Sequence, residues 1–361
     1  MSKPYDGQLA EICEKFRIES SLDSVETLTD GIINKTFKVN FTSGKSYLLQ
    51  QINSFVFARP EQVMGNIDLV TAHIMKKNPD GCNLHFHHTA DGKNYYIDKN
   101  GSFWRLRNFL DAVTFNTCDD IAVLENAGRA FGRFQNMLSD FDASVLCETI
   151  PGFHNTVSRM ETLFEHASSD PMGRAAEVAR ELDFISSVRE KATGLCKMTM
   201  SGTIPTRVTH NDTKISNVLF DKNTRLPLTV IDLDTVMPGM AAYDFGDTVR
   251  SAAGTASEDE RDLSIVSLDI AKFDAYAKGF VSETRSGLTK TEIDTLAQGA
   301  FCVTVEQAVR FLDDYLTGDK YYKISYPLHN LCRARCQLKL AGDMLEKLPA
   351  MEKIVAKYAA L

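Results

Sequence analysis

The spacing of apolar residues along the chain changes once, near residue 110. Before that point, residues 29–53 alternate apolar and polar positions, and Thr42-Ser43-Gly44 interrupts them, which predicts a β-hairpin. Residues 60–78 carry apolar side chains at helical intervals, and strand-like runs return between residues 84 and 110. The first 110 residues are therefore expected to form a small sheet with one helix packed against it.

After residue 110 the pattern is almost entirely helical. Two acidic residues, Asp119 and Asp120, open a run with one apolar face that continues to about residue 140. Period and length predict further helices over 172–193, 262–281, 290–316 and 330–359. We therefore expect an α+β protein with a sheet-containing lobe over residues 1–110, a mainly helical lobe over residues 111–361, and a cleft between them.

Charge and composition exclude several classes of partner. The net charge of the 361 residues is −8 and no block of Lys and Arg reaches five, so a nucleic acid is not an expected partner. No run of 18 apolar residues occurs and the N-terminus carries no signal-peptide pattern, so no membrane partner is expected. Eight cysteines without a C-x-x-C pair favour reduced thiols and a cytoplasmic location. The oligomeric state is left open.

One segment, residues 207–247, combines side chains suited to phosphoryl transfer. A carboxylate on a loop, Asp212 in the sequence His210-Asn211-Asp212, can orient an acceptor hydroxyl and take its proton late. Asn217 lies at the start of the next predicted strand, and Asp232 lies on its expected antiparallel partner. Amide and carboxylate oxygens are ligands that Mg²⁺ accepts. A hairpin would bring these two residues together around one ion.

Each part of this segment also has an ordinary structural explanation. Asp and Asn are common in turns, so Asp212 could cap a turn and the pair Asp232 and Asp234 could lie on an exposed edge. The parts nevertheless occur in the order and at the spacing of a kinase catalytic loop. A turn-rich stretch with Asp244 and Asp247 closes the segment. The combination favours phosphotransfer over accidental assembly.

The motif H-N-D-x-K-x-x-N followed by V-I-D-L-D resembles the aminoglycoside phosphotransferase and choline kinase superfamily, which has a bilobal protein-kinase-like fold. Within it, residues 29–40, 207–247 and 310–340 resemble bacterial N-acetylhexosamine 1-kinases, and the likeness extends over nearly the whole chain. This resemblance implies ATP- and Mg²⁺-dependent phosphorylation of the anomeric hydroxyl of N-acetylglucosamine, N-acetylgalactosamine or a related hexose. An aminoglycoside or choline-type kinase and a non-catalytic nucleotide-binding relative are the alternatives.

The resemblance also implies roles for individual residues. Asp212 would be the catalytic carboxylate, and Asn217 and Asp232 would be the metal ligands. The side chains and backbone groups expected to bind ATP belong to Asp30, Gly31, Asn34, Gln50, Asn108 and Leu110. The small-molecule sugar would contact Asp212, Arg310 and Tyr321.

Three positions leave questions open. Gln50 stands where the wider superfamily usually carries a phosphate-binding Lys, although the sugar kinases that the chain resembles also read L-Q-Q there. Ile32 stands where those kinases can carry a His near the sugar. Arg310 follows Glu306 by four residues, so an ion pair along one helix is an alternative to sugar binding. The acidic run at residues 258–262 is expected to start a solvated helix, and an acidic rim for a polycationic substrate is the other reading.

Overall fold

The computed structural model describes residues 6–28, 34–117 and 119–361. The chain forms two compact units. The first comprises residues 1–113 together with two later segments, 144–150 and 231–237, and the remaining residues form the second. The first unit holds a five-stranded sheet and the second is mainly helical, so the expected α+β class with a kinase-like division into sheet and helices is confirmed.

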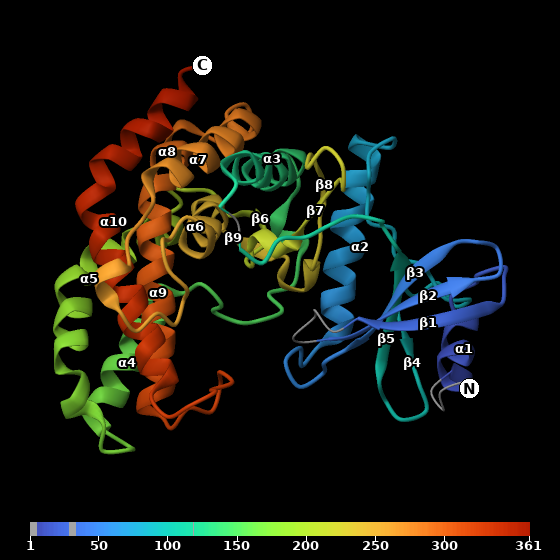
Figure 1. Cartoon of the computed structure of the whole chain (residues 1–361), viewed down its shortest axis with the longest axis horizontal. Coiled ribbons are helices and arrows are strands. Elements are labelled where there is room, and N and C mark those ends of the chain that lie inside the picture. The colour runs from blue at the N-terminus through green and yellow to red at the C-terminus, as the bar shows by residue number, and fades with distance from the viewer. Residues whose placement is uncertain (1–5, 29–33, 118) are drawn as a thin grey trace. The chain divides into compact units, whose positions relative to one another are not determined.

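The sheet of the first unit is antiparallel with the strand order β1-β2-β3-β5-β4. The hairpin predicted around residues 42–44 is present between β2 and β3, and Gly44 takes the positive φ of 79° that its turn requires. The strands, drawn in Figure 1, are β1 Leu22–Leu28, β2 Lys35–Phe41, β3 Ser46–Ile52, β4 Tyr96–Ile97 and β5 Phe103–Asn108. The strand-like run at 84–90 forms only one isolated bridge, from Phe86 to Arg107.

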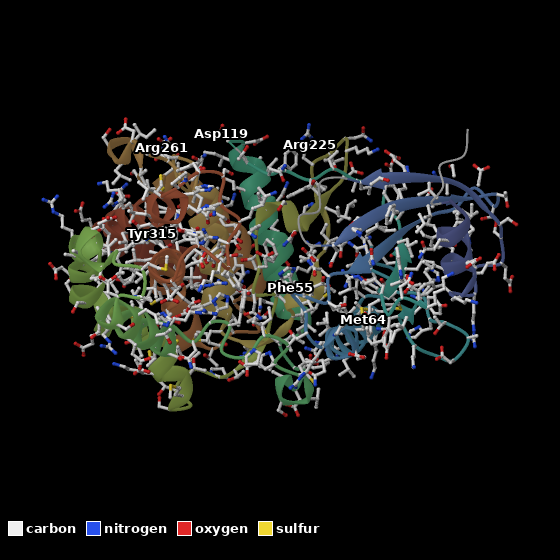
Figure 2. The ribbon with its side chains drawn as sticks, turned by 90° about the horizontal axis from the view of Figure 1, so that it is seen from below. Phe55, Met64, Asp119, Arg225, Arg261 and Tyr315 are labelled. Atoms are coloured by element: carbon white, nitrogen blue, oxygen red, sulfur yellow. The ribbon has the colours of Figure 1, made fainter. Side chains whose placement is uncertain are left out.

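The two faces of this sheet differ in chemistry. One face packs against α1, Asp6–Glu14, in an apolar cluster that includes Phe16, Leu49 and Trp104. Side chains alternate between the faces of a strand, so the opposite face carries the cross-strand partners Gln50 and Arg105. The predicted helix forms as α2, Pro60–Lys77, and it carries Met64, which is labelled in Figure 2. The Met64 sulfur lies 3.9 Å from Nη1 of Arg105. The sheet therefore has an apolar α1 face and a polar face that meets α2.

Helices build almost all of the second unit, and α9 packs against α4, α6 and α10 (Figure 1). The helix predicted after Asp119 and Asp120 begins at residue 121, because the Asp120 carboxylate caps it by accepting the N–H of Ala122. The α-helices are α3 Ile121–Met137, α4 Thr156–Ser169, α5 Ala179–Met200, α6 Ala241–Ala252, α7 Ile270–Thr284, α8 Lys290–Asp294, α9 Leu296–Leu316 and α10 His329–Ala359. Short 3-10 helices occur at Ala143–Val145, Ala175–Val178, Ile215–Asn217, Leu233–Thr235 and Leu263–Ile265.

Glycines bring α6 and α9 into direct backbone contact. A Cβ atom at Gly246 would lie 2.6 Å from the carbonyl oxygen of Gly299, and one at Gly299 would lie 2.1 Å from that of Ala242. Both distances are shorter than any tolerable carbon–oxygen contact, so neither position accepts a side chain without movement. The close approach fixes α6 against α9, and these two helices carry charged residues of the candidate site.

The segment between α5 and α6 contains the short strands β6 Arg207–Thr209, β7 Val218–Phe220, β8 Pro227–Val230 and β9 Met237–Gly239. The expected hairpin is present, since Val218 pairs with Val230. The expectation that Asp232 lies on the partner strand is wrong. Strand β8 ends at Val230, and Asp232 takes a left-handed backbone conformation, φ 61°, before the 3-10 helix Leu233–Thr235. Asp tolerates this conformation better than most residues.

The acidic run at residues 258–262 also differs from the expectation. It is a loop, and only Asp262 caps a short 3-10 helix, Leu263–Ile265. Glu258 instead forms an ion pair with Arg250, and Asp259 lies 3.2 Å from Nε2 of His329. Within the described part of the chain, none of the helices combines the length and the apolar composition that a bilayer crossing requires.

Candidate active site

The loop that follows β6 is held by a buried carboxylate of α6. Asp244 is 1% exposed and accepts the backbone N–H groups of His210 at 2.7 Å and Asn211 at 2.8 Å. Gln135 of α3 donates to the same carboxylate at 2.7 Å. Burial raises the pKa of Asp244, while His210 and these hydrogen bonds oppose the rise. The residue fixes the backbone of the loop that presents Asp212.

Asp212 itself is only part-buried, and two neighbours orient its carboxylate. Asn217 donates from its side-chain nitrogen to the Asp212 carbonyl at 2.8 Å and to Oδ2 at 3.2 Å. Lys214 places its Nζ 2.9 Å from Oδ1. Both carboxylate oxygens therefore have a donor, and the side chain is held in one orientation.

A line of charged groups continues from Lys214 to the interior of the second unit. Burial lowers the pKa of Lys214, but the carboxylates of Asp212 and Asp247 outweigh it and raise that pKa overall. Asp247 accepts from Arg250 Nη2 at 2.9 Å. Burial acts to raise the pKa of Asp247, but the charges of Arg250, Lys214 and His154 lower it overall. His154 is therefore within electrostatic reach of Asp247, which in turn acts on Lys214 beside Asp212.

Arg310 of α9 lies among aromatic rings. Its guanidinium carbon is 5.1 Å from the ring centre of Phe153, 5.7 Å from that of Tyr322 and 6.0 Å from that of Tyr321. Its Nη1 donates to Gln307 at 3.2 Å. We call Arg310, Phe153, Tyr321 and Tyr322 the arginine–aromatic cluster.

A buried network lies next to this cluster. Glu306 is 1% exposed and contacts His154 Nδ1 at 2.7 Å, and it also accepts from Thr156. Arg159 donates twice to the carbonyl of Phe153, at 3.0 and 2.7 Å. The four-residue spacing along α9 allowed an ion pair from Glu306 to Arg310, but the side chain of Glu306 bonds to His154 and Thr156 instead. Glu306 thus neutralises part of a strongly positive region.

The chain around Tyr321 is anchored by one carboxylate. Asp314, which is buried, accepts the backbone N–H groups of Lys320 and Tyr321 at 2.8 Å each and of Tyr322 at 2.9 Å. Asn330 of α10 donates to it at 2.8 Å. Tyr321 remains 68% exposed. Its ring is therefore presented on a fixed backbone with most of its surface accessible.

The residues expected to bind ATP lie in the first unit. Asp30, Gly31 and Ile32 lie outside the described residues. Asn34 is described, and it donates to Asp234 Oδ2 at 2.8 Å and accepts the N–H of Asn53 at 2.9 Å. Gln50 contacts Thr36 and Arg105 on the polar face of the sheet.

The segment after β5 was expected to meet adenine through its backbone. The Asn108 backbone N–H already donates to the His85 carbonyl at 3.1 Å, and its own carbonyl accepts from Arg107 at 2.9 Å. For Leu110, in contrast, no described residue bonds to the backbone N–H or carbonyl. Leu110 is thus better prepared than Asn108 to offer both groups to a base.

Asn217 and Asp232, the expected metal ligands, each carry oxygen atoms of a kind that divalent cations bind. Because the Asn217 nitrogen is committed to Asp212, its Oδ1 is directed away from Asp212 and can serve as a ligand. Asp232 belongs to the first unit, where its charge acts on the buried Arg107. An amide oxygen and a carboxylate are donors that Mg²⁺ accepts when phosphate oxygens and water complete its shell.

A family model described as the phosphotransferase enzyme family matches residues 24–277, which is most of the chain. The chain belongs to the phosphotransferase enzyme family. The match includes the loop around Asp212 and the D-L-D segment, so the aminoglycoside and choline kinase superfamily inferred from the motif is confirmed. This phosphotransferase is therefore a member of a group of small-molecule kinases.

Solved structures share the fold of this phosphotransferase. An aminoglycoside phosphotransferase from Alicyclobacillus acidocaldarius matches with a TM-score of 0.64 and 10% identity, covering 99% of this chain and 98% of that one. A choline kinase from Cryptosporidium parvum matches with a TM-score of 0.55 and 12% identity over 98% and 99% of the two chains. An amicoumacin kinase in complex with AMP-PNP and Ca²⁺ matches with a TM-score of 0.57 and 14% identity, covering 98% of this chain and 94% of that one. That complex is consistent with ATP and a divalent metal as cofactors of the fold.

The sequence did not reveal several residues that shape the site. The sequence suggests no specific role for Asp244 within its turn-rich stretch, and no local motif marks Asp314. Phe153 and His154 precede α4 and contact Arg310 and Glu306 of α9, so no local pattern marks these pairs. An acidic residue within an apolar helical stripe, as at Glu306, is the one signal that could have indicated a buried partner.

Proposed function

We propose that this protein is an ATP-dependent sugar 1-kinase that phosphorylates the anomeric hydroxyl of an N-acetylhexosamine or a related hexose. The observation that carries the proposal is the arginine–aromatic cluster in the same unit as Asp212. A neutral sugar has no charge to steer it, so hydrogen-bond donors and flat apolar rings must discriminate it. Arg310 supplies a rigid fork of donors, and Tyr321 supplies an exposed ring with a hydroxyl.

In this mechanism Asp212 orients the anomeric hydroxyl and accepts its proton late in the transfer. Lys214 and Asn217 keep the carboxylate in place by bonding one oxygen each. Asn217 and Asp232 would hold Mg²⁺, which when bound neutralises charge on the transferred phosphoryl group. Asp30, Gly31, Asn34 and Gln50 would contact or shape the phosphate site, and Asn108 and Leu110 the adenine site.

The charge of the cluster argues against the alternative acceptors. Burial is the larger cause of the lowered pKa of Arg159, and the positive charge of Arg310 lowers it further. An aminoglycoside would add several positive charges to this region. Choline would require ring faces for its ammonium group, and the guanidinium of Arg310 already lies near three rings. A neutral polyol meets neither obstacle.

A phosphotransfer screen with MgATP tests the proposal. The acceptors would be N-acetylhexosamines, hexoses, choline and aminoglycosides, and phosphorus NMR would locate the phosphate on the product. We expect turnover with a hexosamine or hexose and phosphate on the anomeric oxygen. Phosphate on O6, or turnover only with choline or an aminoglycoside, would contradict the sugar 1-kinase assignment. Binding of MgATP without turnover on any acceptor would favour a non-catalytic relative.

A further inference from the structure

Gln50 is oriented by a guanidinium on the neighbouring strand. Strand register pairs Gln50 of β3 with Arg105 of β5, and Arg105 Nε donates to the Gln50 amide oxygen at 2.9 Å. The amide nitrogen of Gln50 then donates to Thr36 Oγ1 at 3.2 Å. The sheet therefore carries its buried cation on β5, directly beside the position where the wider superfamily usually has a Lys on β3.

Both terminal nitrogens of Arg105 bond to one carboxylate. Its side chain is 2% exposed and that of Asp234 is 3% exposed. Nη1 bonds to Oδ1 of Asp234, and Nη2 donates to Oδ2 at 3.1 Å, so the pair is two-pronged. Two charges at this depth are tolerated only when each satisfies the other. The Gln50 oxygen accepts the remaining Nε–H of the guanidinium fork.

The Arg105–Asp234 pair holds two pieces of the nucleotide site. Asp234 Oδ2 also accepts from Asn34 Nδ2 at 2.8 Å, at the end of the D-G-I-I-N sequence. Asp234 follows Asp232 by two residues, and the Asn66 side chain holds the far end of this segment by donating to the Val236 carbonyl at 2.9 Å. Arg105 and Asn66 thus anchor the chain at two points that closely follow Asp232, at residues 234 and 236.

We propose that Arg105 is the positioning cation of the nucleotide site, acting through Asp234 on the backbone of Asp232 and on the side chain of Asn34. The proposal rests on the proposed function, because Asp232 and Asn34 are the groups assigned there to metal and phosphate. In this arrangement position 50 requires an uncharged side chain that accepts a hydrogen bond from Arg105, and Gln50 meets both conditions. A lysine at position 50 would place an ammonium group against the guanidinium, and like charges at this depth repel strongly.

The decisive variant is therefore Gln50→Lys, with Gln51→Lys as its matched control. Gln51 is the next residue of β3, and it pairs with Trp104 on the α1 face of the sheet. Calorimetry on the full chain would measure Kd for MgATP and for adenosine, which has no phosphate. We expect Gln50→Lys to weaken MgATP binding about tenfold or more and to leave adenosine binding unchanged, as for other groups that orient metal ligands. Gln51→Lys should change neither affinity.

A gain instead of a loss in MgATP affinity would overturn the proposal. If position 50 simply lacks its cation, Gln50→Lys would bind MgATP more tightly than the wild type. An unchanged Kd for MgATP, or an equal loss for MgATP and adenosine, would overturn it too. Thermal unfolding of each variant checks folding. If Gln50→Lys does not fold, Arg105→Lys is measured in its place, because this substitution keeps the positive charge and loses the two-pronged contact with Asp234. A ratio of MgATP affinity to adenosine affinity equal to that of the wild type would then overturn the proposal.

MgATP binding requires no acceptor, so this experiment is separable from the acceptor screen. The expected affinity pattern without turnover on any sugar would remove the sugar 1-kinase proposal and leave the role of Arg105. Sugar phosphorylation by the wild type, together with an unaltered MgATP affinity in Gln50→Lys, would keep the sugar 1-kinase proposal and remove the role of Arg105. A wild-type chain that does not bind MgATP would contradict both.

Discussion

Asn217 donates from one side-chain nitrogen to two oxygens of Asp212, the backbone carbonyl at 2.8 Å and Oδ2 at 3.2 Å. The same contact sets the direction of both side chains. It turns the second oxygen of Asp212 toward Lys214 and leaves the Asn217 carbonyl oxygen available to a cation. The proton acceptor and one metal ligand of the proposed reaction are therefore a single rigid pair.

Replacing Asp212 with Asn should lower kcat about 10²- to 10⁴-fold, because the amide cannot accept the proton of the acceptor hydroxyl. The KM for ATP should change little, since Asp212 acts on the acceptor. Steady-state kinetics with the acceptor found in the screen would measure both. Asp183→Asn, on the exposed surface of α5, is the control. A kcat within about twofold of wild type would remove Asp212 from the chemistry.

Replacing Asp232 with Asn should weaken nucleotide binding only when metal is present. A neutral amide is a poorer ligand than a carboxylate, so Kd for MgATP should rise about tenfold or more. Kd for ATP measured in EDTA should stay at the wild-type value. Calorimetry with and without Mg²⁺ distinguishes the two conditions, and an equal loss in both would show that Asp232 holds the fold rather than the ion.

Replacing Arg310 with Ala should raise the KM for the sugar about 10- to 100-fold, because the donors that recognise it are lost. The KM for ATP should remain near the wild-type value. Arg335→Ala is the matched control, since Arg335 pairs with Glu181 between α10 and α5. A rise in the KM for ATP instead would place Arg310 outside the acceptor site.

Glu306 should make the protein sensitive to acid. Burial alone would raise the pKa of Glu306, but His154 and Arg159 lower it below the ordinary 4.5. The unfolded chain then binds this proton more readily, so the stability from Glu306 is present above that value and is lost as the pH falls through the folded pKa. The slope is at most about 1.4 kcal/mol per pH unit for one proton.

Urea unfolding between pH 7 and pH 3 would measure this loss, and Glu306→Gln should flatten the dependence in the acidic range. Glu190→Gln, at an exposed position of α5, should leave it unchanged. An identical slope in wild type and Glu306→Gln would assign the acid sensitivity to other carboxylates.

Elements with strong local signals were predictable from the sequence. The helix at α2 carries Pro60 at its start and apolar residues at helical spacing, and the hairpin at residues 42–44 carries the glycine that its turn needs. α1 and β1 were missed. α1 has only nine residues, and it is stabilised by packing on the sheet rather than by its own propensity.

The candidate site was predictable only where its residues are close in sequence. Asp212 and Asn217 are five residues apart, and they entered the prediction together as parts of one kinase-like motif. Arg105 and Asp234 are separated by 129 residues, and Arg310 and Phe153 also come from distant segments. Tertiary packing creates these pairs, and no local period records it. Tertiary packing also ends β8 at Val230, which is why the prediction that Asp232 lies on this strand was wrong.

The composition of the first unit has a consequence for how the chain is made. Arg105 is synthesised long before Asp234, and residues 231–237 complete the unit that begins at the N-terminus. During synthesis the guanidinium of Arg105 therefore stays hydrated until residues 114–143 and 151–230 of the second unit have also been made. A fragment ending at residue 113 would retain that cation without its carboxylate. The sheet thus depends on a stretch of chain far downstream, and a fragment that ends before residue 231 is not a ready-made module for transfer to another protein.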